Sequence, residues 1–313
     1  MSITDQRSLQ STKLIALDQY FNEMIKLYDA GLFPKVLLLS GKKGIGKFTL
    51  VFHFLNYIYS KNEKTHYNTK DKLINLDSSF YVSILNQTNA DVIFLQAEEG
   101  KNVKIDNIRN LKSVLSRSSL SKNLRFTIID EVEFLNNNSV NALLKTLEEP
   151  STNNYFILIN NQQSELIETV SSRCLRNNIY LNEEQKKKVI NYFVDNKKIK
   201  INIEDSYDLT PGLLLKYNDA YNKYNIDNNE KILLKLNKLL HGYKKDKDKD
   251  LIKMSLFFID QFFYKLVKDN KNHIDFLLNL KSIIVNKIND FITYNLNINS
   301  VLNSIELKLK NVQ

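Results

Sequence analysis

The chain has 313 residues, and its 43% hydrophobic and 25% charged composition excludes a disordered or collagen-like protein. A net charge of +9 is compatible with nucleic-acid binding, but general lysine and asparagine enrichment explains it more simply. The single cysteine, Cys174, excludes a disulfide framework and a zinc cage built from cysteines. A polar amino terminus, Met1–Leu9, predicts a cytoplasmic protein.

Up to about residue 181, short apolar runs alternate with segments of helical period, which predicts a parallel α/β sheet with crossover helices. The length predicts two or three domains. Beyond residue 181 only helical repeats remain, interrupted by a polar break at Asn222–Asn229, and Leu251–Val267 is expected to be a buried amphipathic helix rather than a membrane span. The charged run Lys244–Asp250 is expected to be a solvated turn between helices. The predicted strands are Val36–Ser40, Asp91–Leu95, Phe126–Asp130, Tyr155–Ile159 and Asn178–Leu181.

Glycine is scarce, and its distribution gives the first indication of function. The chain has 7 glycines, whereas average usage would give about 22. Three of them, Gly41, Gly44 and Gly46, fall in the segment Gly41–Lys47, which follows the first strand and opens a helix. A glycine-rich loop in this context is typical of a P-loop, whose backbone N–H groups and lysine bind phosphate.

The residue after the P-loop lysine departs from this pattern. Phe48 stands where a serine or threonine hydroxyl would coordinate Mg²⁺. Thr49 comes one residue later, and about 100° of helical rotation should turn its hydroxyl away from the metal. The loop, with Ile45 between its last two glycines, is therefore expected to hold ATP or ADP at most as a vestigial ligand and to hydrolyse it poorly.

An apolar strand ending in two acids follows at Phe126–Glu131, which resembles a Walker B arrangement. Asp130 would orient the Mg²⁺ shell, and Glu131 would position an attacking water. Asn138 or Ser139 is expected to cap the next helix. Its apolar face is spaced i, i+3, i+4 and i+7 and is closed by a proline: Val140, Leu143, Leu144, Leu147 and Pro150.

Arginine is also rare, with six residues in the chain, and Arg173 lies within the segment Ser171–Cys174 just beyond the fourth strand. A guanidinium can clamp a γ-phosphate on a neighbouring subunit, which a lysine does less well. Without further context, a surface ion pair explains a lone arginine more simply.

Taken together, these segments resemble the clamp-loader branch of the AAA+ ATPases. The segments Asn141–Pro150 and Ser172–Cys174 resemble the signature after Walker B and the arginine-finger motif of that branch. Lys101–Arg109, Thr210–Gly212 and the altered P-loop resemble the delta-prime type of the bacterial DNA polymerase III clamp loader. The resemblance implies a P-loop domain at residues 1–181, a small helical lid at 182–222 and an all-α collar at 223–313.

The resemblance also implies roles for individual residues. Arg173 would act in trans on ATP of a neighbour, Asp130 and Glu131 would be the Walker B acids, and Asn160 would lie near the polar sensor. Gly212 is followed by Leu213, where an arginine is expected, and this replacement argues against hydrolysis in cis. Residues 60–90 hold no cysteine, so no zinc module is expected, and His66 alone cannot rebuild one.

The leading hypothesis is therefore a delta-prime-like stator without an ATPase activity of its own and without a required cofactor. Its implied partners are gamma/tau-type and delta-type subunits in a ring of five, and through that complex the sliding clamp and primed DNA, with no membrane. The alternatives are an ATP-hydrolysing gamma/tau-type motor or other P-loop ATPase, favoured by Lys47 and Glu131, and an unrelated P-loop protein that binds nucleic acid through its lysines.

Overall fold

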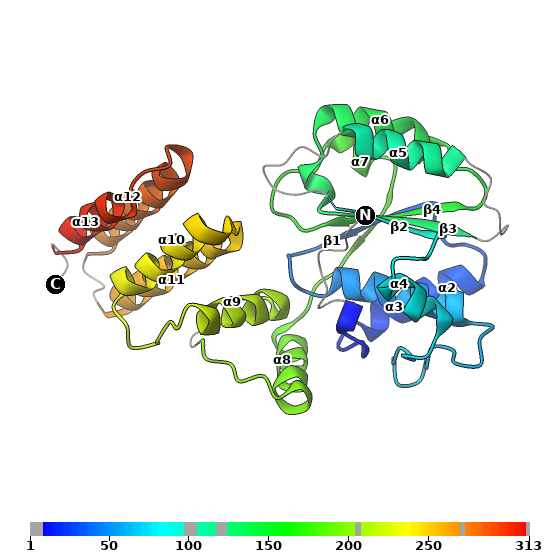
Figure 1. Ribbon diagram of the computed structural model, residues 1–313, viewed down its shortest axis with the longest axis horizontal. Coiled ribbons are helices and arrows are strands. Elements are labelled where there is room, and N and C mark those ends of the chain that lie inside the picture. Colours follow the sequence, from blue (N-terminus) through cyan, green and yellow to red (C-terminus); the bar gives the residue numbers. More distant parts are fainter. Residues whose placement is uncertain (1–8, 97–104, 117–123, 204–207, 270–272, 311–313) are drawn as a thin grey trace. The chain divides into compact units, whose positions relative to one another are not determined.

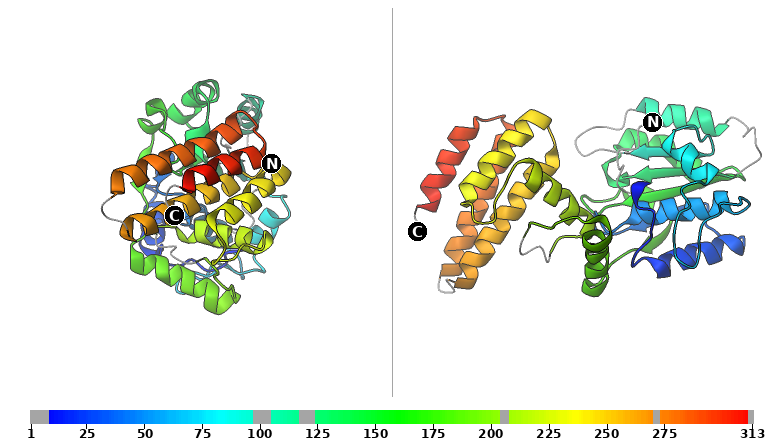
Figure 2. Two further views of the ribbon diagram at one scale, coloured as in Figure 1. Left: turned by 90° about the vertical axis from the view of Figure 1, so that its left-hand side faces the viewer. Right: turned by 60° about the horizontal axis from the view of Figure 1, so that its bottom comes forward.

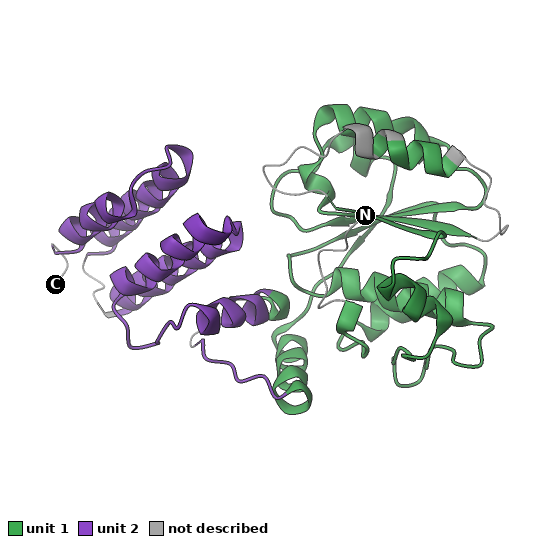
Figure 3. Cartoon of the chain, viewed as in Figure 1, with its two compact units in different colours: residues 1–197, 210–212 green, residues 198–209, 213–313 purple. Residues whose placement is uncertain are grey.

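The computed structural model describes residues 9–96, 105–116, 124–203, 208–269 and 273–310, and the chain divides into two compact units (Figure 3). Unit 1 comprises residues 1–197 and 210–212, and unit 2 comprises residues 198–209 and 213–313. This division separates parts of the chain that are compact in themselves and does not test functional boundaries. The boundaries expected after residues 181 and 222 therefore stay predictions.

Unit 1 is built on a five-stranded parallel sheet with the strand order β2-β3-β4-β1-β5 (Figure 1). The first four strands lie within one residue of their predicted positions, because each is an apolar run covered on both faces. The strands are β1 (Val36–Ser40), β2 (Val92–Gln96), β3 (Arg125–Asp130), β4 (Asn154–Asn160) and β5 (Leu175–Asn178).

The fifth strand corrects the prediction, which placed it at Asn178–Leu181. The observed strand, Leu175–Asn178, lies at the edge of the sheet and pairs with Leu37–Ser40 of β1. Its side chains are largely exposed and mostly polar, because backbone hydrogen bonds on one side hold it in place. The apolar residues that suggested a strand, Ile179 and Leu181, follow its end and are buried.

Helices cover both faces of the sheet, which gives unit 1 three layers (Figure 1). Along β1 the side chains alternate: Leu37 and Leu39 pack towards α2, α3 and α4, whereas Val36 and Leu38 pack towards α5, α6 and α7. The helices of this unit are α2 (Asp18–Asp29), α3 (Lys47–Ser60), α4 (Ser79–Leu85), α5 (Ile105–Ser116), η1 (Val132–Phe134), α6 (Asn137–Glu148), α7 (Glu168–Ser171) and α8 (Glu183–Lys197).

Helix α6 follows the Walker B strand as predicted, but its cap differs. The amino-terminal cap is Asn136, not Asn138 or Ser139, and its side chain accepts a hydrogen bond from the Ser139 backbone N–H at 2.8 Å. A cap residue needs extended backbone angles, and Asn136 has them, whereas the residues expected to cap already lie within the helix. The buried face is Val140, Leu143 and Leu147, with Leu144 partly buried beside it.

Unit 2 contains helices only among its described residues, as the sequence predicted. Figure 2 shows α10 to α13, coloured yellow to red, packed side by side, and their facing residues form one apolar core. The helices are α9 (Pro211–Lys223, whose first two residues belong to unit 1), α10 (Ile232–Asp246), α11 (Lys249–Asp269), α12 (Ile274–Thr293) and α13 (Ile298–Leu309). Within the described ranges, no helix is long and apolar enough to cross a membrane.

The charged run at Lys244–Asp250 is only partly the solvated turn that was predicted. Helix α10 continues to Asp246 and α11 already begins at Lys249, so the turn is confined to Lys247 and Asp248. The alternating charges therefore continue into the first turn of α11. There Asp250 is buried and forms an ion pair with Lys216.

Candidate functional site

The candidate nucleotide site lies at the end of the sheet where the parallel strands reach their last residues, which we call the carboxyl edge. Ser40 of β1 pairs in register with Asn160 of β4, and Asp130 of β3 pairs with Ile159. The loop Gly41–Lys47 follows β1 directly at this edge. The sheet therefore brings the P-loop together with the Walker B acids and the polar end of β4, both of which lie more than 80 residues further along the chain.

Glycine is required in the P-loop for two different reasons. A Cβ atom on Gly41 would lie 2.3 Å from the carbonyl oxygen of Ile179, so close backbone approach excludes a side chain there. Gly44 and Gly46 have φ angles of 83° and 95°, which side chains rarely tolerate. Ile45, between them, is buried in the core against α3. The loop thus has the tight backbone path that a phosphate-binding turn needs.

The P-loop lysine turns back onto its own loop. Lys47 is buried, and its Nζ donates to the carbonyl oxygens of Gly41 at 2.6 Å and Lys42 at 2.9 Å. Burial lowers the pKa of Lys47 to about 8, against the opposing effect of the nearby Asp130 and Glu133 charges. Its hydrogen bonds to loop carbonyls would have to be exchanged before the ammonium could reach a phosphate.

The position expected to hold the metal-binding hydroxyl is apolar. The ring of Phe48 packs against the ring of Phe94 in β2 with 5.6 Å between centroids, and it is partly buried against the core. Thr49 is half-buried one residue further along α3. These residues do not fit Mg²⁺ coordination from this helix, since the hydroxyl that bridges loop and metal is missing.

The segment Thr210–Gly212, which belongs to unit 1, lies on the P-loop. The Thr210 hydroxyl donates to the carbonyl oxygen of Lys43 at 2.6 Å, and the Gly212 N–H donates to that of Gly44 at 2.8 Å. A Cβ atom on Gly212 would lie 2.8 Å from Gly44 backbone atoms. This motif therefore fixes the outer side of the loop by direct backbone contact, a contact that the sequence did not reveal.

The two Walker B acids have different environments. Asp130 accepts a hydrogen bond from the Glu131 backbone N–H at 2.8 Å, and burial, together with the Glu131 charge, raises its pKa to about 6. Glu131 is buried, has a left-handed φ of 56°, and forms an ion pair with Lys43 at 2.6 Å. A left-handed conformation is uncommon for a residue with a side chain and concentrates at functional sites. The carboxylate expected to position water is thus bound to the P-loop instead.

At the end of β4, two adjacent asparagines contact different partners. Asn160, the predicted sensor, donates from Nδ2 to the Ser40 hydroxyl at 3.2 Å. Asn161 donates from Nδ2 to Asp130 Oδ1 at 3.2 Å, and its backbone N–H donates to Glu133 at 3.0 Å. Burial raises the pKa of Glu133. Sequence reasoning missed Asn161 and Glu133; their position one residue past a strand end and two past the acid pair was the available signal.

Arg173 lies at the opposite end of the sheet, where the parallel strands begin, which we call the amino edge. It precedes β5, whose first residue Leu175 pairs with Leu37 near the start of β1. At roughly 3.3 Å per residue, the four residues of β5 place Arg173 about 13 Å from the carboxyl edge. The separation exceeds the reach of the side chain, so Arg173 does not belong to the same site as the P-loop.

The guanidinium of Arg173 is held by the end of α6 and by α7. Its Nε donates to Glu148 Oε1 at 2.7 Å, and its Nη2 lies 2.5 Å from the same oxygen. Its Nη1 donates to the Thr169 carbonyl at 2.8 Å and to the Ser172 hydroxyl at 3.3 Å. The neighbouring Cys174 is half-buried, and burial raises the pKa of its thiol to about 11, so it is not a reactive thiolate at neutral pH.

Other residues that the sequence analysis considered lie away from both the P-loop and Arg173 or outside the described residues. Of the segment Lys101–Arg109, residues 101–104 lie outside the described residues, and residues 105–109 form the start of α5. The described residues contain no group of three or more His, Cys, Asp or Glu side chains that could hold a metal ion. His53 is packed in the core between the Tyr67 hydroxyl and the Ser11 carbonyl, each 2.9 Å away, and burial lowers its pKa to about 4.

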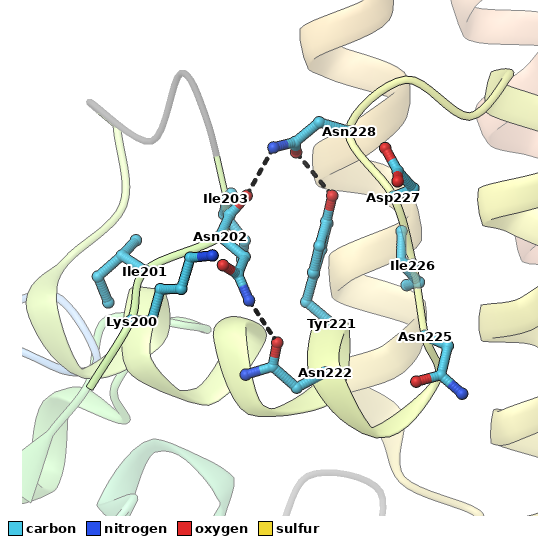
Figure 4. A pocket seen from close by; sticks show the side chains of 10 residues that line it. All are labelled: Lys200, Ile201, Asn202, Ile203, Tyr221, Asn222, Asn225, Ile226, Asp227 and Asn228. Carbon is cyan, nitrogen blue, oxygen red and sulfur yellow. Dashed lines mark hydrogen bonds between the residues drawn. The ribbon is translucent and has the colours of Figure 1, made fainter. Parts of the chain in front are cut away.

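Unit 2 has a separate cavity of about 680 Å³ between the segment at residues 200–203 and the end of α9 (Figure 4). Its polar groups bond one another: Asn202 Nδ2 donates to Asn222 at 2.6 Å, and the Tyr221 hydroxyl donates to Asn228 at 2.7 Å. This cavity contains none of the residues predicted for nucleotide binding.

The sequence is similar to one protein family and to individual relatives. The profile of the family described as "DNA polymerase III, delta subunit" matches residues 17–183. DNA polymerase III subunit delta' of Pseudomonas aeruginosa is 34% identical over 90 residues, which cover 28% of this chain and 27% of that protein. The subunit delta' of Escherichia coli is 25% identical over 159 residues, covering 49% and 45% of the two chains.

A gamma subunit is also similar. DNA polymerase III subunit gamma of Buchnera aphidicola is 29% identical over 149 residues, which cover 48% of this chain and 39% of that protein. The matched part spans between 27% and 45% of the length of these three relatives. The family match at residues 17–183 lies in the P-loop half of the chain.

Proposed function

The chain belongs to the DNA polymerase III delta subunit family of clamp-loader AAA+ subunits, and we propose that it is a delta-prime-like stator of that loader. In this role it does not hydrolyse ATP itself. It joins the loader and donates Arg173 to ATP bound by an adjacent subunit, and so contributes to placing the sliding clamp on primed DNA.

The observation that carries this proposal is the separation of Arg173 from the P-loop. The arginine precedes β5 at the amino edge of the sheet, whereas Gly41–Lys47 follows β1 at the carboxyl edge. An arginine in this place can contact a phosphate only if another molecule supplies it. Its side chain is 30% exposed, so it is accessible to a neighbour.

The P-loop edge supports the absence of hydrolysis in cis. Phe48 provides no hydroxyl for Mg²⁺, Lys47 donates to loop carbonyls, and Glu131 is paired with Lys43. If ATP or ADP binds, the N–H groups of Gly41–Lys47 would hold its phosphates, and the nucleotide would serve as a structural ligand. No cofactor is required and no zinc is expected.

The proposed partners follow from the relatives, which are named as gamma, tau and delta' subunits of DNA polymerase III. We expect the chain to bind gamma/tau-type and delta-type subunits in a ring of five, in the cytoplasm. Co-purification with these subunits tests the assignment, because a free P-loop ATPase would not form a stable complex with them.

The proposal is tested by replacing Arg173 in the assembled loader. Arg173→Ala should leave assembly intact and lower ATP hydrolysis at the neighbouring site by about a hundredfold or more, since arginine fingers contribute on the order of 10³ to 10⁵ in kcat. Arg173→Lys keeps the charge but not the planar fork and should recover little activity. An unchanged DNA-stimulated ATPase rate would refute the assignment of the finger.

A second candidate, an ATP-hydrolysing motor, is favoured by the retained Lys47 and the acids Asp130 and Glu131. Similarity to gamma and tau subunits adds to it. The isolated chain separates the two candidates. A stator should show no ATP turnover above background, whereas steady turnover that is abolished by Lys47→Ala would identify a motor.

A further inference from the structure

The guanidinium of Arg173 is almost fully engaged within its own chain. Arginine has five N–H donors in a planar fork. Three form hydrogen bonds: Nε–H donates to Glu148, and the two Nη1–H groups donate to the Thr169 carbonyl and the Ser172 hydroxyl. In addition, Nη2 lies 2.5 Å from Glu148 Oε1 in an ion pair. Bidentate binding of a phosphate needs two adjacent donors. Arg173 must therefore release at least one of these partners before it can clamp phosphate.

Glu148 is the partner that opposes phosphate most directly. A single oxygen, Oε1, accepts a hydrogen bond from Nε and lies 2.5 Å from Nη2, and these two nitrogens form one complete edge of the fork. The carboxylate occupies the position of a phosphate oxygen and also neutralises the charge that a phosphate would meet. The other two acceptors are neutral oxygens from α7 and the residue after it, so they bind the opposite side of the fork without cancelling its charge.

The ion pair is suited to exchange. Glu148 is the last residue of α6, and its side chain is 47% exposed, while that of Arg173 is 30% exposed. Exposed pairs contribute little to stability, so a phosphate can displace the carboxylate at small cost. A negative charge at the carboxyl end of a helix is also unfavourable, so its removal should not impair folding.

We propose that Glu148 is a positioning residue that holds Arg173 in a docked position and is exchanged for phosphate when the arginine acts on a neighbour's nucleotide. This inference rests on the proposed function of Arg173. Glu148 touches neither nucleotide nor metal in this scheme and acts only through the arginine.

The first test uses the isolated full-length chain and needs no partner. The rate at which phenylglyoxal modifies Arg173 is measured by site-resolved mass spectrometry. Glu148→Gln keeps the size of the side chain and removes its charge, so it should accelerate modification about two- to fivefold, as expected for loss of a surface ion pair. Glu149→Gln is the matched control, because Glu149 is an exposed neighbour at the same helix end, whereas Arg173 bonds to Glu148. Equal rates in all three proteins would overturn the proposal.

The second test measures ATP hydrolysis by the assembled loader as a function of ATP concentration. Glu148→Gln should raise kcat/KM at the neighbouring site about two- to fivefold, while Glu149→Gln should leave it unchanged. A fall in kcat/KM would mean that Glu148 is needed to orient the active arginine, and an unchanged value would mean that it has no part; either result overturns the proposal.

The comparison with Arg173→Ala separates the two levels of inference. If Arg173→Ala lowers the rate but Glu148→Gln does not raise it, the proposed function stands and the Glu148 inference fails. If Arg173→Ala has no effect on the rate, the proposed function fails, while the modification rates still decide whether Glu148 restrains the guanidinium.

Discussion

The two edges of the parallel sheet in unit 1 hold their charged groups under opposite conditions. At the carboxyl edge, Lys47 and Glu131 are buried and bound to partners within the edge itself, and burial shifts the pKa of Lys47. At the amino edge, Arg173 and Glu148 form an exposed ion pair. An internally bonded nucleotide edge and an accessible arginine are what a subunit needs if it acts on another subunit's ATP.

The largest effect is expected at the carboxyl edge, from a side chain on Gly41. An alanine Cβ would lie 2.3 Å from the Ile179 carbonyl oxygen and 2.8 Å from Ile45 Cδ1, so backbone must move. We expect Gly41→Ala to lower the local free energy of opening by about 3 kcal/mol. The chain has no tryptophan, so hydrogen exchange of peptides covering residues 36–60, followed by mass spectrometry, is the suitable measurement.

Gly31→Ala is the control for that experiment. Gly31 has a φ of 70° but open space around its Cβ position, so alanine should cost only about 1 kcal/mol of backbone strain. If both variants lost protection equally, close packing of the P-loop against Ile179 would not be what fixes the loop.

Much of this carboxyl edge could be predicted from the sequence, because its signals are local. The strand Val36–Ser40 is apolar throughout, and the glycines of Gly41–Lys47 follow it immediately. Strand β5 could not be placed correctly, since an edge strand at Leu175–Asn178 is held by backbone hydrogen bonds and needs no apolar run.

Most of the side-chain contacts at the candidate site could not be predicted from the sequence. Glu148 and Arg173 are 25 residues apart, and Lys43 and Glu131 are 88 residues apart, so no spacing rule joins them. The choice between Asn160 and Asn161 as the partner of Asp130 depends on which way the chain turns after β4. Sequence patterns locate elements, whereas these pairs depend on how the elements pack.

A comparable or slightly smaller effect is expected from Asp130→Asn, which should stabilise unit 1 by roughly 2 to 3 kcal/mol at pH 7. Burial raises the pKa of Asp130 from 3.8 to about 6. A raised carboxyl pKa gives stability that is present below pH 3.8 and is lost as pH rises through 6. The gain of the variant should therefore be absent near pH 4 and complete above about pH 6, measured by urea unfolding followed by circular dichroism.

Asp77→Asn provides the comparison, because Asp77 is an exposed residue just before α4. Such a surface substitution should change stability by less than about 0.5 kcal/mol at either pH. A stability loss in Asp130→Asn at pH 7 would mean that the ionised acid is favoured in its place, and burial would not be what governs the pKa of Asp130.

The smallest effect is expected at the amino edge. Arg173→Ala should lower the free energy of unfolding by less than about 1 kcal/mol, because the side chain is partly exposed and an exposed ion pair gains little over hydration. The same measurement on Glu148→Ala and on the double variant gives the coupling energy, which should be about 0.2 to 1 kcal/mol.

The combination of a small stability change with a large loss of loader activity would distinguish the two edges of the sheet. A residue whose main task is structural would lose stability and activity together, as expected for Gly41. If Arg173→Ala cost more than about 2 kcal/mol, the arginine would be a structural link between α6 and α7. A fall in loader ATPase would then follow from misfolding, and the exposed pair would no longer support an action in trans.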